Sequence, residues 1–193
     1  MRDALNPHPP ATTLILGGVR SGKSRHAAEI AKTTGCAVTV IATATAQDLE
    51  MAERIELHRT HRPKEWSVVE EPVRLAAALA AAASPSRIVI VDCLTLWLTN
   101  LLCGDDPGAL RRESKHLLEI LPSLPGECVL VSNEVGFGII PANALARRFA
   151  DETGSLHQQL AALCDRVIFR AAGLPLSLKD LARREAPSGG CAP

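Results

Sequence analysis

One stretch of this sequence decides the fold, and it reads Gly17-Gly18-Val19-Arg20-Ser21-Gly22-Lys23-Ser24. It fits the phosphate-loop pattern G-x-x-x-x-G-K-[ST], in which glycines allow backbone N–H groups to point at phosphate oxygens. The apolar run Thr12–Leu16 precedes it, and the helix-favouring segment Lys23–Lys32 follows it. Strand, loop and helix in this order predict a nucleoside triphosphate site, with Lys23 on the β- and γ-phosphates and Ser24 on Mg²⁺.

A partner for this loop is predicted at the end of another buried strand. Four β-branched apolar residues, Ile88–Val91, lead directly into Asp92. In proteins with a phosphate loop, an Asp at such a position holds Mg²⁺, often through water. The alternative is that Asp92 caps a helix over Leu94–Leu102. The agreement of strand and loop favours the metal-binding role.

Short apolar strands alternate with helical segments along the rest of the chain. We expect strands at Thr12–Leu16, Ala37–Ala42, Arg87–Val91, Cys128–Val131 and Val167–Phe169, with an edge strand at Trp66–Val69. We expect helices at Lys23–Lys32, Asp48–Thr60, Pro72–Ala83, Ala109–Leu121 and Asn143–Cys164. Continuously apolar strands between helices are typical of a mostly parallel sheet covered on both faces. The pattern therefore predicts a three-layer α/β fold.

The organisation of the chain is expected to be simple. Neither an internal repeat nor a linker divides it, so residues 1–180 are predicted to form a single domain. The last segment, 181–193, is rich in Pro, Gly and Ser and poor in large apolar residues. We expect it to be a disordered tail.

Composition excludes several classes of protein. The 193 residues contain 21 Lys and Arg against 21 Asp and Glu, a net charge of zero, and only 3% are aromatic. A nucleic-acid binder would usually be basic or rich in stacking aromatics, so we expect no nucleic-acid partner. No apolar run approaches the length of a membrane span, and the polar N-terminus lacks a signal-peptide core. A cytoplasmic protein is expected, and its neutrality permits self-association.

A histidine in the segment Asp48–Trp66 is the third candidate for function. Met51, Ile55 and His58 are spaced i, i+4 and i+7, so His58 continues one face of a helix. It is either a half-buried structural histidine or a functional group. His58 and His61 could also share a metal, but no third ligand with suitable spacing is present. The neighbouring arginines form either a solvated face or a polyphosphate site: Arg54, Arg59 and Arg62.

Polar residues also follow the predicted strand Cys128–Val131. Ser132, Asn133 and Glu134 come directly after it, and ligands of open α/β sheets bind outside the carboxyl ends of strands. We consider Glu134 as a group that orients a substrate hydroxyl or takes its proton. Ordinary turn chemistry is the alternative for all three residues.

Taken in order, these stretches resemble the bifunctional adenosylcobinamide kinase / adenosylcobinamide-phosphate guanylyltransferase family of cobalamin (vitamin B12) biosynthesis. The resemblance spans about Leu14 to Lys179. It is carried by Gly17–Arg25, Ile41–Thr43, Glu50–Arg62 with Trp66, Val91–Asn100, Ser132–Pro141 and Asn143–Leu160. The segment Asn133–Gly136, together with the helix around Leu145–Phe149, is much more specific than the phosphate loop.

The resemblance implies a RecA-like P-loop fold, a homotrimer and two reactions. First, ATP or GTP phosphorylates the aminopropanol hydroxyl of the corrinoid adenosylcobinamide. Second, GTP transfers GMP to that phosphate through a guanylylated histidine, which matches His58, and pyrophosphate is released. Besides Gly17–Ser24, the implied nucleotide contacts are Ala42, Thr43, Ala44, Arg59, Thr60, His61, Arg62, Glu70 and Asp92. Position 44 departs from some relatives, which carry Ser there.

This chemistry constrains the helix that carries His58. Its imidazole must come within about 3–3.5 Å of the α-phosphorus to react. The helix must therefore lie over the phosphate loop or swing over it, and residues 42–50, with Gln47 and Asp48, are the expected hinge.

Two other functions are considered. A small-molecule kinase with the same loop would need no histidine intermediate. A GTPase switch would read guanine through an Asn-Lys-x-Asp segment, and this sequence has none.

Overall fold

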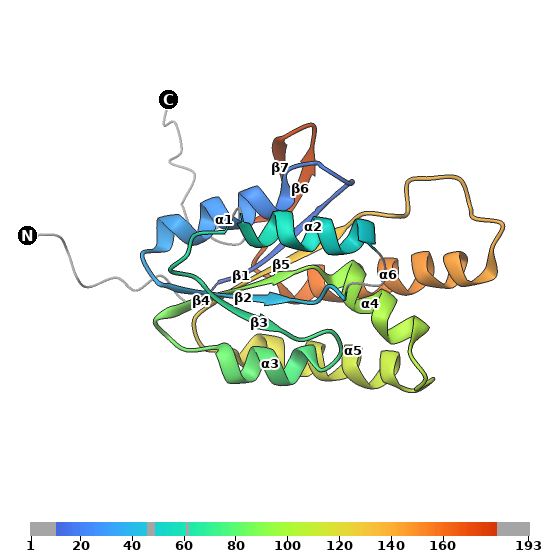
Figure 1. The fold of residues 1–193 in the computed structure, drawn as a ribbon, viewed down its shortest axis with the longest axis horizontal. Coiled ribbons are helices and arrows are strands. Elements are labelled where there is room, and N and C mark those ends of the chain that lie inside the picture. Colours follow the sequence, from blue (N-terminus) through green and yellow to red (C-terminus); the bar gives the residue numbers. More distant parts are fainter. Residues whose placement is uncertain (1–10, 46–48, 61, 181–193) are drawn as a thin grey trace, which may run out of the picture.

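The computed structural model describes residues 11–45, 49–60 and 62–180, without the side chains of Met51, Arg54, Ile55, Leu57 and His58. Helices cover both faces of a central sheet (Figure 1). The predicted three-layer α/β architecture is therefore confirmed. The predictions that concern the tail 181–193, the hinge residues Gln47 and Asp48, and His61 lie outside the described residues.

The central sheet has seven strands in the described part of the chain, in the order β3-β2-β4-β5-β1-β6-β7. Their bounds are β1 Thr12–Gly17, β2 Ala37–Ala42, β3 Ser67–Glu70, β4 Arg87–Asp92, β5 Glu127–Asn133, β6 Arg166–Ala171 and β7 Leu174–Asp180. Neighbouring strands are parallel, apart from the antiparallel pair β6 and β7. The carboxyl ends of the parallel strands consequently meet at one edge of the sheet.

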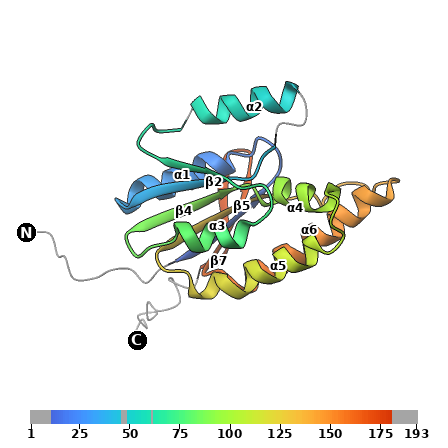
Figure 2. The ribbon, with the colours of Figure 1, turned by 60° about the horizontal axis from the view of Figure 1, so that its bottom comes forward.

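The helices are divided between the two faces of the sheet. On one face lie α1 (Lys23–Thr34) and α2 (Leu49–Thr60). On the other lie α3 (Leu75–Ala82), α4 (Leu94–Cys103), α5 (Ala109–Ile120), which a short 3₁₀ helix (Leu121–Ser123) extends, and α6 (Ala144–Leu163). The helix α2 stands off from the sheet, whereas α1 packs on it (Figure 2). Among these described helices, none has the length and apolar character needed to cross a membrane.

The core occupies both sides of the strands. In β1, Leu14 and Leu16 face the cluster beneath α3 to α6, where Trp97 is fully buried. Ile15 points the opposite way and packs with Ala27 of α1. Because both faces of the sheet are covered, successive residues of a strand are apolar. These continuous apolar runs are the pattern that predicts the sheet from the sequence.

The start of α3 corrects the prediction of a helix over Pro72–Ala83. The helix begins at Leu75, three residues later than predicted. The Glu71 carboxylate accepts the backbone N–H groups of Val73 (3.0 Å) and Arg74 (2.8 Å). The indole N–H of Trp97 donates to the Val73 carbonyl at 2.7 Å. These bonds fix a turn in place of the first helical turn that Pro72 suggested.

The strand β7 is missing from the predicted elements. Its sequence contains Pro175, which cannot donate to a strand ladder and therefore belongs on an edge strand. The alternation of Leu174, Leu176 and Leu178 is the signal that could have identified it. All three side chains are exposed, so β7 shows an apolar row on its surface.

The turn before β5 predicts a large effect of a single methyl group. Gly126 has φ of 80°, and a Cβ on it would overlap the carbonyl oxygens of Ser84 and Arg87. We expect Gly126→Ala to lower the free energy of unfolding by about 3 kcal/mol, since strain and overlap add. Chemical denaturation measures this change.

Gly138→Ala is the matched control for this substitution. A Cβ at Gly138 meets no atom within 4 Å, and its φ lies outside the left-handed region. We expect a change below about 0.5 kcal/mol. Equal effects of the two substitutions would contradict the packing described for Gly126.

Candidate functional site

The phosphate loop lies at the carboxyl edge of the sheet, between β1 and α1. Gly17 has φ of 152°, and a Cβ on it would overlap the Arg170 carbonyl oxygen of the neighbouring strand β6. Gly22 adopts φ of 90° as the N-cap of α1. Glycine is therefore required at both ends of the loop, and the N-terminus of α1 faces the enclosed space, where it favours an anion.

The side chain of Lys23 is folded against its own loop. Its Nζ donates to the Gly18 carbonyl at 2.6 Å and lies 3.5 Å from the Ser21 hydroxyl. The residue is only 7% exposed. Burial lowers the pKa of Lys23, and the nearby Cys93 and Asp92 partly offset this effect. The loop thus carries a buried cation beside its backbone N–H groups, an arrangement suited to a polyphosphate.

Ser24 and Asp92 line the same cavity. It has a volume of about 580 Å³ and runs between α1 and residues 62–66, and Arg62 and Trp66 also line it. Asp92 ends β4, which is separated from β1 by β5 alone. The sequence prediction that Ser24, Asp92 and Arg62 belong to one site agrees with this arrangement.

The donors in this cavity fit Mg²⁺ held partly by a nucleotide. No group of three His, Cys, Asp or Glu suited to a metal occurs within residues 11–45, 49–60 and 62–180. A hydroxyl and a single carboxylate are the usual protein contribution when phosphates and water complete the magnesium shell. The helix-cap alternative for Asp92 has no support, because Cys93 is the N-cap of α4 and makes no side-chain cap bond.

The loop after β2 is fixed by buried hydrogen bonds. The Thr43 hydroxyl donates to the Cys93 carbonyl (2.7 Å) and accepts the Cys93 N–H (3.0 Å), so it joins the ends of β2 and β4. Asn100 Nδ2 donates to the carbonyls of Thr43 (2.8 Å) and Pro72 (3.0 Å). Asn100 Oδ1 accepts the Thr45 hydroxyl at 3.1 Å. Of the predicted contacts Ala42, Thr43 and Ala44, the hydroxyl of Thr43 is thus engaged within the fold.

Two other predicted contacts, Arg59 and Glu70, pair with each other. Arg59 Nη2 donates to Glu70 Oε1 at 2.6 Å, which links α2 to the end of β3. Both side chains are more than half exposed. In water such a pair contributes little to stability.

The position of His58 is described only through the direction of α2, because its side chain lies outside the described residues. The helix α2 begins next to the carboxyl edge of the sheet and runs back toward the opposite edge (Figures 1 and 2). Residue 58 belongs to its last turn. The predicted nucleophile therefore lies on the end of α2 that points away from the loop.

Two buried polar residues beside the phosphate loop were missed by the sequence analysis. Arg170 is 4% exposed, its Nη2 donates to the Gly173 carbonyl at 2.5 Å, and its Nε has no hydrogen-bond partner among the described residues. His157 of α6 is 6% exposed and bonds Ser132. A signal existed for His157, because it falls on the same helical face as Leu156 and Leu160, where a polar residue needs a partner.

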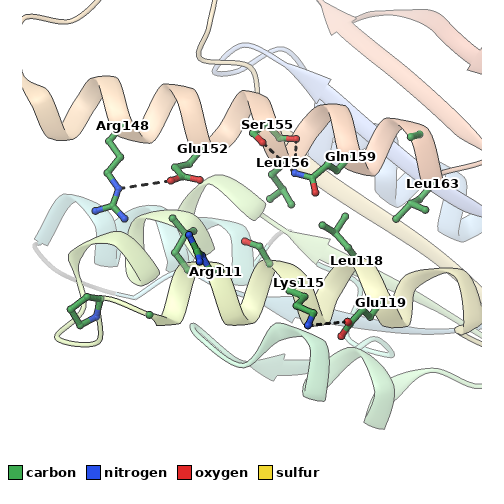
Figure 3. Close-up of a pocket in the computed structure, with 15 residues that line it drawn as sticks. Arg111, Lys115, Leu118, Glu119, Arg148, Glu152, Ser155, Leu156, Gln159 and Leu163 are labelled. Carbon is green, nitrogen blue, oxygen red and sulfur yellow. Dashed lines mark hydrogen bonds and ion pairs between the residues drawn. The ribbon is translucent and has the colours of Figure 1, made fainter.

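A second groove, with a volume of about 1050 Å³, lies away from this site, between α5 and α6 (Figure 3). Charged side chains on its rim pair along their own helices, Lys115 with Glu119 (3.7 Å) and Arg148 with Glu152 (3.9 Å). None of the residues predicted for nucleotide binding lines it. The smaller cavity, in contrast, is lined by three of the predicted nucleotide contacts, Ser24, Arg62 and Asp92.

Known proteins resemble this chain over most of its length. A family profile, described as cobinamide kinase / cobinamide phosphate guanyltransferase, matches residues 13–178. The bifunctional adenosylcobalamin biosynthesis protein CobP of Pseudomonas aeruginosa is 55% identical over 166 residues, which cover 86% of this chain and 96% of the relative. The protein CobU of Escherichia coli, described in the same words, is 40% identical over 179 residues, covering 86% and 98%.

A solved structure shares the fold. The structural study of project PH0250 from Pyrococcus horikoshii OT3 superposes with a TM-score of 0.50 at 10% identity, covering 89% of this chain and 87% of that one. At so low an identity the likeness concerns the architecture alone.

The buried bonds of Thr43 predict a loss of stability on substitution. Thr43→Val keeps the shape of the side chain but leaves the N–H of Cys93 without its partner and removes one of two bonds to the Cys93 carbonyl, which still accepts the Trp97 N–H at 3.2 Å. We expect the free energy of unfolding to fall by about 1–3 kcal/mol. Thr45→Val is the control, because Thr45 is exposed and water replaces its bond. Denaturant unfolding of both variants checks this, and equal losses would contradict it.

Proposed function

This chain belongs to the cobinamide kinase / cobinamide phosphate guanyltransferase family, and we propose that it catalyses both reactions at one phosphate loop. In the first, ATP or GTP phosphorylates the aminopropanol hydroxyl of adenosylcobinamide. In the second, GMP passes from GTP to that phosphate, which yields adenosylcobinamide-GDP and pyrophosphate for adenosylcobalamin biosynthesis. The observation that carries the proposal is the loop Gly17–Ser24 with its buried Lys23, inside the range matched by the family.

The kinase step is a displacement at the γ-phosphorus. The substrate oxygen forms the new P–O bond, the bond to the β-phosphate breaks, and a nucleoside diphosphate leaves. Lys23 and the loop N–H groups stabilise the charge on the phosphates. Ser24 and Asp92 would hold Mg²⁺, which neutralises phosphate charge when bound.

The guanylyl transfer proceeds through two displacements at the α-phosphorus. A nitrogen of the His58 imidazole attacks it, a P–N bond forms and pyrophosphate leaves. A phosphate oxygen of the corrinoid then attacks the same phosphorus, and the P–N bond breaks to release His58. The same loop and Lys23 serve here, because the triphosphate occupies the same cradle.

Movement of α2 is required for this route. The position of α2, standing off from the sheet, and its exposed Arg59–Glu70 ion pair support such a movement. The Asn100 bonds hold Thr43 and Thr45 in place after β2, so α2 is the element that moves relative to the sheet in this proposal. We propose that His58 reaches the nucleotide when α2 turns relative to β2.

We propose that the enzyme is a cytoplasmic homotrimer. Contiguous exposed apolar side chains support self-association, because monomers rarely display them. In the loop after β5, Phe137, Ile139 and Ile140 are at least 80% exposed. Phe137 contacts Phe169 of β6 with ring centroids 5.8 Å apart, next to the exposed leucines of β7.

Light scattering with size-exclusion chromatography tests the trimer. We expect a mass of three chains for the wild type. Ile139→Asp should shift the mass to one chain, since a charge cannot be buried in an apolar interface. A wild type that runs as a monomer would contradict the proposal.

Covalent labelling tests the guanylyl transfer. We expect α-labelled GTP to leave acid-labile, base-stable label on the protein, as a P–N bond requires. His58→Ala should abolish the label and slow guanylyl transfer by at least about 10³-fold, because the nucleophile is lost. Its kinase rate should stay within about 3-fold, as hydroxyl phosphorylation does not use the imidazole.

His116→Ala is the control, since His116 is exposed on α5. This variant should label like the wild type. If the wild-type protein carries no label but has full kinase activity, the chain is a small-molecule kinase without nucleotidyl transfer. Guanylyl transfer that survives in His58→Ala would refute the histidine route.

A further inference from the structure

A network of three side chains lies at the carboxyl end of β5. His157 Nε2 lies 2.7 Å from the Ser132 hydroxyl, and its Nδ1 lies 3.7 Å from Glu134 Oε2. Ser132 is fully buried and His157 nearly so. The side chain of Glu134 is 19% exposed. The network therefore runs from the buried hydroxyl of Ser132 to the partly exposed carboxylate of Glu134.

The backbone of Glu134 adjoins the phosphate loop. The backbone N–H of Glu134 donates to the carbonyl of Gly17, the first residue of the phosphate loop, at 3.0 Å. Ser132 pairs in register with Leu16 of β1. Since β5 lies between β1 and β4, its end lies between the phosphate loop and Asp92.

The protonation state of His157 decides which groups of the network donate a hydrogen bond and which accept one. Burial lowers the pKa of His157, and the nearby Glu134 carboxylate partly offsets this. A neutral imidazole has one N–H donor and one acceptor. Because a carboxylate only accepts, the proton belongs on Nδ1, facing Glu134, and Nε2 accepts the Ser132 hydroxyl. Ser132 thus fixes the ring, and the ring turns its N–H toward Oε2 of Glu134, 3.7 Å from Nδ1.

The other oxygen of Glu134 is also held. Its Oε1 accepts the backbone N–H of Gly136 at 2.6 Å. The Gly136 N–H holds one oxygen and the His157 ring faces the other at 3.7 Å, so the carboxylate has a preferred orientation, and its remaining lone pairs are free to accept a proton from solvent or substrate. A carboxylate bound only for structure would not need to remain partly exposed beside a phosphate loop.

We infer that Glu134 accepts the hydroxyl proton in the kinase step and that His157 is the residue that positions it. This inference rests on the proposed kinase reaction. As the substrate oxygen bonds to the γ-phosphorus and the nucleoside diphosphate leaves, the hydroxyl proton passes to the Glu134 carboxylate and then to water. Ser132 and His157 hold the carboxylate and exchange no proton with substrate.

The guanylyl transfer should not depend on this network. Its acceptor is a phosphate monoester, which has lost its protons near neutral pH and attacks without a base. The protein therefore carries out two reactions at one phosphate loop, and only the kinase step needs Glu134. A general loss of structure would slow both, whereas loss of positioning slows the kinase step alone.

The test compares the two half-reactions in His157→Leu. Phosphorylation of adenosylcobinamide and guanylylation of separately supplied adenosylcobinamide phosphate are measured. We expect the kinase kcat to fall by about 10- to 100-fold, as expected for a misplaced proton acceptor. The KM for adenosylcobinamide and the guanylylation rate should each stay within about 2-fold.

Two further variants test whether His157 acts only through Glu134. Glu134→Gln should lower the kinase kcat by about 10²-fold or more. Adding His157→Leu to Glu134→Gln should cause no further loss, because the group that His157 positions is gone. Thr153→Val is the control on the same face of α6, where a buried hydroxyl bonds Phe149 O at 2.6 Å, away from Glu134. It should leave both half-reactions within about 2-fold.

Ser132→Ala keeps the test decisive if His157→Leu does not fold. It removes the bond to Nε2 and leaves the ring in place, and we expect the kinase kcat alone to fall by about 3- to 10-fold. An unchanged kinase rate, equal losses in both half-reactions, or additive losses in the double variant would overturn the inference. A wild type that phosphorylates no cobinamide would instead overturn the proposed function itself.

Discussion

The site depends on the close approach of three strands at Gly17. Its carbonyl accepts the N–H of Glu134 from β5, while its missing side chain leaves room for the Arg170 carbonyl of β6. A single Cβ would push these strands apart. Because the phosphate loop starts at Gly17, this contact sets the distance between the loop, with its Lys23 cation, and the polar groups that end β5 and β4.

One part of the proposed site is held by the core, and the other lies on a helix that stands off from the sheet. Lys23, Ser24 and Asp92 lie on elements that pack in the core, and buried bonds of Thr43 and Asn100 fix the adjoining loop. The helix α2 instead stands off from the sheet and is linked to the end of β3 by a solvent-exposed ion pair. An enzyme that carries out two reactions at one triphosphate benefits from this division, since its nucleophile is needed in only one of them.

Local sequence patterns were sufficient for the layers of the fold and for the phosphate loop, because apolar runs and glycine spacing record local geometry. The predicted start of α3 at Pro72 was wrong. The Glu71 carboxylate and the Trp97 indole fix a turn there, and these bonds override the preference of Pro72 for the first turn of a helix. The pairing of Ser132 with His157 joins positions 25 residues apart, and no local pattern encodes it. Such contacts are set by the sheet order and the docking of α6, which only the tertiary structure contains.

The central claim is that one phosphate loop serves both reactions, and Lys23→Ala tests it most directly. Both half-reactions are measured in this variant and in Lys115→Ala, whose lysine is exposed on α5. The account predicts that Lys23→Ala slows phosphorylation and guanylylation together, each by about 10²–10³-fold, while Lys115→Ala changes neither. A Lys23→Ala protein that loses one activity and keeps the other would contradict it.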